Sequence, residues 1–249
     1  NYVIYLKNKK QNNLHLKGHS MSNYPEPNVI PSQEYEELID AYKLMHKDER
    51  AFMGISLIPL TYIIKSIFEE NKVKSFLDYG CGKGLLYTKD FKKADKGSKY
   101  PDLKEPIQDT FGITEFSLYD PAYSEHAEPP TKQYDAVIST DVLEHIPSQD
   151  LDWVMDKIYS HATKIVFLNV CGAAAIRTFP EGKHKGRNVH VSLFDNEWWV
   201  NQCYKIRQKH KHLKIYLTWQ STKGIVGTCI KGEEDGTTKS NRSSDKTAG

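Results

Sequence analysis

A short apolar run that ends in closely spaced glycines constrains this chain more than any other feature. The run "VKSFLDYG" at residues 73–80 is followed by Gly82 and Gly84, and then by "LLYTKDF". Short apolar runs bounded by glycine are typical of buried strands. A glycine-rich turn between a strand and a helix is typical of sites for nucleotide-like ligands. We therefore expect an α/β fold, with a helix starting within 83–91 and a ligand at the turn.

The spacing of these glycines argues against two common ligands. The dinucleotide fingerprint needs a third glycine at the position that Leu85 occupies. The P-loop needs Ser or Thr directly after its lysine, whereas Lys83 is followed by Gly84. Asp78 would repel a pyrophosphate, but it could accept hydrogen bonds from an ammonium group. The turn therefore favours a ligand with an ammonium group over NAD, FAD or a nucleoside triphosphate.

Strand-like and helix-like patterns alternate along the rest of the chain. Short apolar and β-branched runs predict further strands at 114–120, 134–140 and 163–170, and a hairpin of 213–220 with 224–230. Apolar residues at helical spacing predict helices around 35–42, 60–68, 151–159 and 199–206. Asp195 could cap the last of these helices. The alternation predicts a doubly wound, mostly parallel sheet that is closed by an antiparallel hairpin.

Composition divides the chain into one domain with polar ends. Residues 1–31 are expected to be disordered or extended, with Met21 as the native start, and 232–249 to be a disordered tail. The domain would span 32–231, with a helical cap at 32–70 and a core at 73–231. Residues 92–112 are charged and are broken by glycine and proline, which predicts a surface insertion.

Three predicted strands end in residues suited to ligand binding. In an open parallel sheet, ligands bind beyond the carboxyl ends of strands, where the strand order reverses. Asp120 ends one strand, and an acid in that place can accept both ribose hydroxyls. It lies 36 residues after Gly84, against the usual ~20, and the insertion would account for the excess. The run "STDVLEHI" follows another strand, although Asp141 there could simply cap a helix.

Together these motifs resemble the class I S-adenosylmethionine-dependent methyltransferases. "LDYGCGKG" looks like their first motif, "LYDPAY" like their ribose-binding region, and "YDAVISTDVLEHIP" like their fourth-strand motif. The ordered motifs cover roughly 73–170, and the hairpin extends the likeness to about 231. The resemblance implies a seven-stranded sheet that binds S-adenosyl-L-methionine. It also implies the contacts: Asp78, Gly80, Cys81, Gly82 and Gly84 for the methionine part, Asp120 for the ribose, and Asp141 and Val142 near the adenine or sulfonium.

One segment departs from the family's pattern. Tyr134 follows Asp120 by only fourteen positions, and Pro129 and Pro130 are adjacent within that interval. The family usually places a helix and a further strand there, so the third strand is expected to be shortened or lost. Pro121, with the two residues after it, could then form a replacement wall for the adenine.

The acceptor is less well defined by the sequence. If a hydroxyl or ammonium is methylated, its proton must be removed, and histidine suits that role. His145 and His190 are therefore the catalytic candidates, as a base or as substrate contacts; either could also be a hydrogen-bonded structural residue. The net charge of +2 does not favour nucleic acid as a partner. "DPAY" resembles a motif of DNA adenine methyltransferases, but it ends a different strand. A capped cleft suits a small or medium-sized acceptor.

The remaining composition bears on disulfides, metal sites and membrane spans. Two other functions stay open. The four cysteines form no C-x-x-C pair, which favours free thiols over disulfides or a zinc site, and no metal ligands are expected. No apolar run approaches the ~20 residues of a membrane span, so a soluble cytoplasmic protein is expected. The sequence does not determine the oligomeric state. The shortened segment after Asp120 leaves open a non-catalytic cofactor-binding or interaction module. A nicotinamide oxidoreductase is less favoured because of Leu85.

Overall fold

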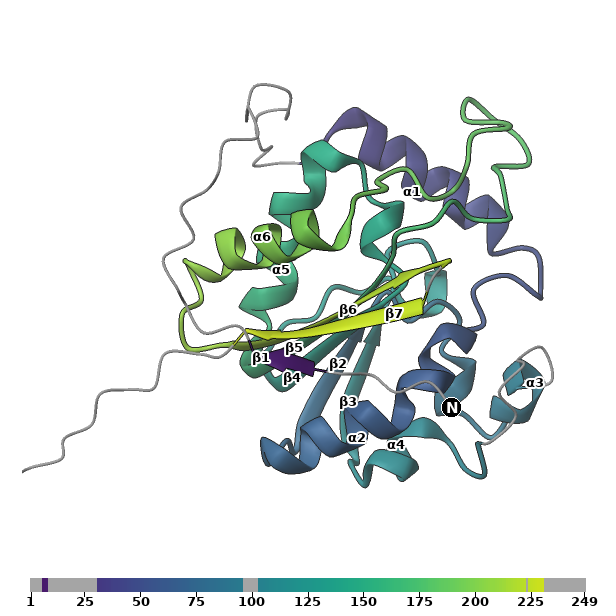
Figure 1. The fold of residues 1–249 in the computed structure, drawn as a ribbon. Coiled ribbons are helices and arrows are strands. Elements are labelled where there is room, and N and C mark those ends of the chain that lie inside the picture. The colour runs from purple at the N-terminus through teal and green to yellow at the C-terminus, as the bar shows by residue number, and fades with distance from the viewer. Residues whose placement is uncertain (1–5, 9–30, 96–102, 223, 231–249) are drawn as a thin grey trace, which may run out of the picture.

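A seven-stranded sheet forms the centre of the molecule (Figure 1). The computed structural model describes residues 6–8, 31–95, 103–222 and 224–230. Two sequence predictions, that Met21 is the native start and that 232–249 form a disordered tail, concern residues outside these ranges. The strand order is β1-β7-β6-β5-β4-β2-β3. The strands are β1 (Leu6–Asn8), β2 (Ser75–Tyr79), β3 (Glu115–Tyr119), β4 (Tyr134–Thr140), β5 (Ala162–Cys171), β6 (Lys214–Ser221) and β7 (Gly224–Ile230).

Helices cover both faces of this sheet, which confirms the predicted doubly wound α/β class. Figure 1 shows α1, α5 and α6 on one face and α2 and α4 on the other. None of the helices in the described ranges combines the length and apolarity that crossing a bilayer requires. The helices are α1 (Gln33–Met45), α2 (Thr61–Glu70), α3 (Phe91–Asp95), α4 (Ile107–Phe111), α5 (Leu151–Ser160) and α6 (Asn196–Arg207).

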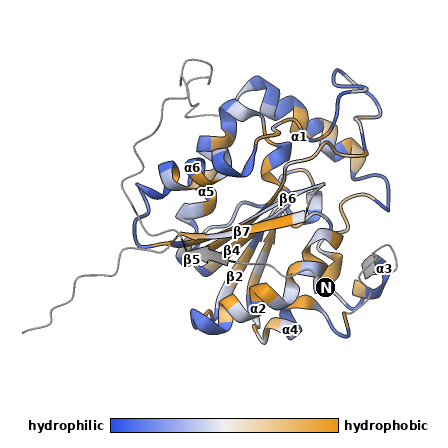
Figure 2. Cartoon of the chain, viewed as in Figure 1, coloured by the Kyte–Doolittle hydropathy of each residue, from blue (hydrophilic) through white to orange (hydrophobic). Residues whose placement is uncertain are grey.

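The two faces have separate apolar layers. On one face α5 and α6 contribute Ile158 and Trp199, each 0% exposed, and on the other α2 contributes Phe68 at 2%. Figure 2 shows the corresponding pattern, with hydrophobic stretches on α2 and the strands and hydrophilic residues on the outer side of α6. As expected, Asp195 caps α6, because its side chain accepts a hydrogen bond from the backbone of Trp198.

The strand pairing places a reversal of strand order at β2. This strand pairs in parallel with β3 on one side and with β4 on the other. The chain therefore passes from β2 outward to β3 and then back across to β4, which creates the crevice in which α/β proteins bind ligands. Between β3 and β4 the chain forms only a short 3-10 helix, Ser124–His126. The expected loss of the third strand is thus confirmed, and β3 becomes the outer strand.

The closing hairpin is confirmed, with one addition at its edge. β6 is parallel to β5, and β7 is antiparallel to β6. β7 is not the outermost strand, however, because β1 pairs with it in parallel. Residues 6–8, within the segment expected to be disordered or extended, therefore form part of the sheet.

The helix start expected within 83–91 is confirmed, but the helix is broken into two short pieces. A 3-10 helix covers Leu85–Tyr87, and α3 starts at Phe91. Between them Thr88 has an extended backbone, and its hydroxyl oxygen accepts a hydrogen bond from the backbone N–H of Asp90 at 3.1 Å. A threonine side chain that binds a nearby backbone N–H competes with the helical hydrogen bond, and the helix is interrupted here.

The expectation of a surface insertion at 92–112 is wrong for its last part. α4 buries Ile107 and Phe111, which are 0% and 6% exposed. The ring centroid of Phe111 lies 5.1 Å from that of Phe68 and 5.6 Å from that of Phe76. The two buried residues are four positions apart, so they share one helix face. A single apolar pair among charged residues did not stand out in the sequence.

Phe111→Ala tests whether this segment belongs to the core. Removing a buried phenylalanine should lower the free energy of unfolding by about 3–5 kcal/mol. Asp109→Ala is the matched control, since Asp109 lies exposed on the same short helix and its loss should cost less than about 1 kcal/mol. Urea denaturation measures both variants. Equal, small losses would mean that α4 is a surface element after all.

Candidate functional site

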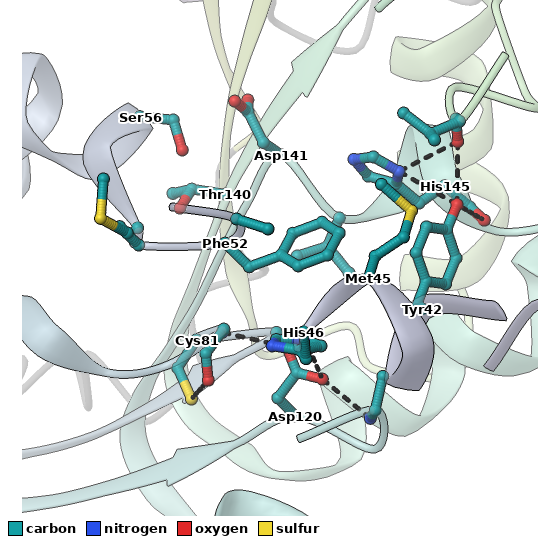
Figure 3. Close-up of a pocket in the computed structure, with 18 of the residues that line it drawn as sticks. Tyr42, Met45, His46, Phe52, Ser56, Cys81, Asp120, Thr140, Asp141 and His145 are labelled. Carbon is teal, nitrogen blue, oxygen red and sulfur yellow. Dashed lines mark hydrogen bonds and ion pairs between the residues drawn. The ribbon is translucent and has the colours of Figure 1, made fainter. Parts of the chain in front are cut away.

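A cavity of about 430 Å³ opens at the carboxyl ends of β2, β3 and β4 (Figure 3). The segment after the β2 strand, the start of the loop after β3 and the turn after β4 supply its floor. Except for Tyr123, the last residue of the expected adenine wall, the residues that sequence reasoning named as cofactor or catalytic contacts line this one cavity. They are Asp78, Gly80, Cys81, Gly82, Gly84, Asp120, Pro121, Ala122, Asp141, Val142, His145 and His190.

Gly80 brings two strand ends into contact. Its φ is +89°, a left-handed conformation that residues with a side chain rarely adopt. A Cβ atom at this position would lie 2.2 Å from Cγ2 of Val142. The absence of a side chain therefore allows the turn after β2 to pack directly against the turn after β4.

The segment after α1 docks on the same turn. The backbone N–H of Lys83 donates to the carbonyl of Phe52 at 2.9 Å, and a Cβ on Gly82 would lie 2.3 Å from that oxygen. Phe52 itself has a φ of +52°. Strained backbone in a residue of this size persists only where its surroundings impose it, and it is common at ligand sites. The chain is thus held over the cavity by backbone contacts.

Asp78 presents an unpartnered carboxylate oxygen at the cavity. One oxygen accepts a hydrogen bond from the Tyr87 hydroxyl at 2.7 Å. The other, Oδ1, is buried and has no hydrogen-bond partner among the described residues. Burial raises the pKa of Asp78 to about 7. A buried acceptor without a donor is costly, so this oxygen is suited to a donor brought by a ligand.

Asp120 is held by the backbone around it. Its two oxygens accept hydrogen bonds from the N–H groups of Gly82 and Ala122, each at 2.9 Å. Burial raises the pKa of Asp120 in spite of these donors. The Nε2 atom of His46 lies 3.9 Å from one of the oxygens (Figure 3). Burial lowers the pKa of His46 to about 4, so this contact is not an ion pair near neutral pH.

Two further buried carboxyl groups follow β4. Asp141 has a φ of +54° and accepts a hydrogen bond from Asn169 at 2.7 Å; burial raises its pKa. Glu144 is 0% exposed and accepts from the Cys171 N–H at 2.8 Å through Oε1. Burial, and secondarily the charge of Asp141, raise the pKa of Glu144 well above its usual range.

The two candidate histidines are neighbours. Their ring centroids are 4.7 Å apart and the rings are nearly perpendicular. Nδ1 of His145 lies 3.0 Å from the carbonyl of Val189, and Nδ1 of His190 lies 2.6 Å from that of Ala173. Because a carbonyl only accepts, we assign the proton to Nδ1 in each neutral ring, which leaves Nε2 with the lone pair. Burial lowers the pKa of His145 to about 3.

Sequence reasoning missed the residues that α1 and the following loop contribute. Tyr42, Met45, His46, Phe52 and Ser56 all line the cavity (Figure 3). The Tyr42 hydroxyl donates to the carbonyl of Val189 at 2.8 Å, and it lies 3.1 Å from Nδ1 of His145. The apolar spacing predicted the helix, but a spacing does not say which distant loop the buried face will contact.

The segment 32–70, expected to form a cap, divides between two places. α1 and the loop that follows it lie at the cavity, through residues such as Tyr42 and Phe52. α2 instead covers the sheet, where the Phe68 ring packs against Phe76 of β2 at 5.6 Å. The part of the segment above the cavity is therefore residues 33–57.

Comparison with known proteins identifies one family. A sequence model described as "Methyltransferase domain" matches residues 59–212. The matched region includes the glycine-rich turn, Asp120, the turn after β4 and His190, and it leaves out α1. No curated protein matches the chain.

The raised pKa of Asp78 predicts a pH-dependent loss of stability. In the unfolded chain the pKa of Asp78 is ~3.9, whereas in the folded protein it is about 7. The folded state therefore holds the proton more tightly, and this stabilisation is full below about pH 4 and is lost as the pH rises to about 7. Relative to Asp78→Asn, the wild-type free energy of unfolding should fall by roughly 1.4 kcal/mol per pH unit across this window.

Urea denaturation of both proteins between pH 4 and pH 8 measures the difference. A second variant, Tyr87→Phe, removes a hydroxyl that favours the ionised carboxylate, so it should move the end of the window to higher pH. A difference between wild type and Asp78→Asn that stays constant with pH would contradict the raised pKa.

Proposed function

The chain belongs to the methyltransferase domain family, and on that premise we propose that it binds S-adenosylmethionine in the cavity and transfers the methyl group to a small or medium-sized acceptor. The family match covers more than half of the chain, and the resemblance of its motifs to class I methyltransferases is confirmed. The main support for this cofactor is Oδ1 of Asp78, which has no hydrogen-bond partner among the described residues. It offers a buried acceptor for the ammonium group of the methionine part.

The glycine-rich turn supports this placement of the methionine part. Asp78 is 3% exposed, and a cation beside a buried carboxylate favours its ionised form. Gly80, Gly82 and Gly84 carry no side chains, so the backbone of the turn lines the cavity directly, together with Cys81. Lys83 points away, since its Nζ donates to the carbonyl of Asp48 at 2.5 Å. No cation of this turn therefore competes with an ammonium group.

Asp120 is the proposed ribose contact. Each of its oxygens accepts one backbone hydrogen bond, and a carboxylate oxygen has a second lone pair. Both can therefore accept from ribose hydroxyls without giving up the bonds that fix the side chain. Pro121 and Ala122, at the start of the shortened segment, line the same cavity. We place the adenine against them, with Val142 and Asp141 on the side of the β4 turn.

The acceptor is proposed to lie beside the two histidines. S-adenosylmethionine supplies a methyl group on a positively charged sulfur, which is transferred by in-line displacement. The protein must align the acceptor and exclude water. His190 is the stronger candidate for contact with the acceptor, through Nε2. His145, with a pKa of about 3, is a weak base, and it fits an acceptor contact that is held in place by Val189 and Tyr42.

The size of the cavity and its cover favour a small-molecule acceptor. A volume of about 430 Å³ lies within the range of small-molecule sites, ~300–1,000 Å³. Residues of α1 and of the Phe52 segment also line it, which favours an acceptor small enough to enter between them and the strand ends.

Binding of the demethylated product tests the proposed cofactor. Saturating S-adenosylhomocysteine should raise the melting temperature of the wild type, because a ligand that binds only the folded state stabilises it. Asp120→Ala should abolish the shift, and Asp78→Asn should reduce it strongly. Asp109→Ala, which removes an exposed carboxylate that does not line the cavity, should retain it. An absent shift in the wild type would contradict the proposed cofactor.

Methyl transfer itself distinguishes an enzyme from a non-catalytic module. Labelled S-adenosylmethionine should lose its methyl group to small hydroxyl-, amine- or thiol-bearing compounds presented in pools. His190→Ala should lower the transfer rate by about 10²-fold or more, the size of a lost acid–base contribution, while the melting shift with S-adenosylhomocysteine remains. Cofactor binding without transfer to any pool would instead favour a binding or interaction module.

A further inference from the structure

We propose that Glu144, Cys171 and His190 form a binding site for a divalent transition metal of the zinc class. A carboxylate oxygen, the Sγ atom and a ring nitrogen of these residues all lie within 4.8 Å of one another. They come from the turn after β4, from the end of β5 and from the loop before α6. The site adjoins the cavity, because His190 is also one of the residues that line it.

Glu144 supplies the observation that points to a ligand. Its side chain is 0% exposed, and Oε1 is fixed by the Cys171 N–H at 2.8 Å. Oε2 is buried and has no hydrogen-bond partner among the described residues. A buried carboxyl group left half-satisfied is destabilising. A bound cation would supply the missing partner of Oε2 and would compensate for the charge.

The other two residues are arranged as metal ligands usually are. Metal-binding histidines commonly donate their second ring N–H to a carbonyl or carboxylate, which fixes the ring. His190 donates from Nδ1 to the Ala173 carbonyl at 2.6 Å. The Cys171 Sγ atom lies 3.6 Å from the same carbonyl. Cys171 is also only partly buried, whereas Cys81 and Cys203 are buried, so a metal ion can reach it.

The chemistry of the three ligand atoms selects the metal. Thiolate and imidazole ligands favour zinc and related transition metals, whereas magnesium and calcium favour sites made of oxygen alone. Three protein ligands leave a fourth position of a tetrahedral zinc site open. The expectation of no metal site rested on the absence of paired cysteines. A site with one cysteine and ligands from three separate segments has no such spacing to detect.

The metal site does not depend on the proposed methyl transfer. If both proposals hold, His190 acts on the acceptor side of the cavity as a metal ligand and not as a free base. Binding of the metal requires the thiolate form of Cys171 and the carboxylate form of Glu144. The thiol proton, and the proton of Glu144 where it carries one, are released to solvent as the metal–sulfur and metal–oxygen bonds form.

Cobalt substitution tests the site in the full-length protein. After treatment with a chelator, the protein should bind one equivalent of Co²⁺ and develop the near-ultraviolet sulfur-to-cobalt band of a thiolate ligand, which Zn²⁺ then removes. Cys171→Ser should abolish the band. Glu144→Gln and His190→Ala should each weaken Co²⁺ binding by about 10-fold or more.

Two matched controls should keep both the band and the affinity. Cys203→Ser removes a buried thiol of α6. His161→Ala removes a histidine whose Nδ1 likewise faces a carbonyl, that of Lys132 at 3.1 Å, at the opposite end of β5. The far-ultraviolet circular dichroism spectrum and the melting temperature without ligand report whether each variant is folded.

A measurement without variants keeps the test independent of their folding. Zn²⁺ should slow the alkylation of Cys171 in the wild type by about 10-fold or more, as located by mass spectrometry. The proposal is overturned if the wild type binds no stoichiometric Co²⁺, if Cys171→Ser keeps the band, or if Zn²⁺ leaves the alkylation rate unchanged. Metal binding without any S-adenosylhomocysteine shift would refute the cofactor proposal alone.

Discussion

The structure depends on how closely the backbone of the turn after β2 approaches its neighbours. A Cβ atom on Gly80 would lie only 2.2 Å from the side chain of Val142, and a Cβ atom on Gly82 would lie only 2.3 Å from the carbonyl oxygen of Phe52. The first contact joins the ends of β2 and β4 at the point where the strand order reverses. The second joins the segment after α1 to the turn. One short glycine-rich segment therefore sets both the floor and the cover of the cavity.

Buried carboxyl groups dominate the chemistry of that cavity and of the turn after β4 beside it. Asp78, Asp120, Asp141 and Glu144 are all largely buried, and burial raises the pKa of each. Such an arrangement costs stability unless donors or cations are supplied. Asp120 has its backbone donors, whereas Asp78 and Glu144 each have one oxygen with no hydrogen-bond partner in the part of the chain that the structure describes. The ammonium group of a cofactor would satisfy Asp78 in the cavity, and a metal ion would satisfy Glu144 beside it.

Prediction from the sequence was accurate where a feature depends on residues close together along the chain, and less accurate where it depends on contacts between distant segments. Strand β4 forms at 134–140, as its apolar run indicated, and Asp195 caps α6. These features depend on neighbours along the chain. The helix start predicted within 83–91 is present, but the helix is interrupted where the side chain of Thr88 takes a local hydrogen bond. The buried face of α4 was missed because two apolar residues gain their meaning only from Phe68 and Phe76 across the layer.

The sequence by itself determined the strand-and-glycine turn, the order of strands β2 to β7 and the loss of a strand between Asp120 and Tyr134. Spacing and composition carry that information, since they act within a few residues. Only the tertiary structure decided that His46 lies over Asp120 and that Glu144, Cys171 and His190 meet. The last two are 19 positions apart, and the path of the loop between them brings them together. Contacts of this kind arise from packing, which no local pattern encodes.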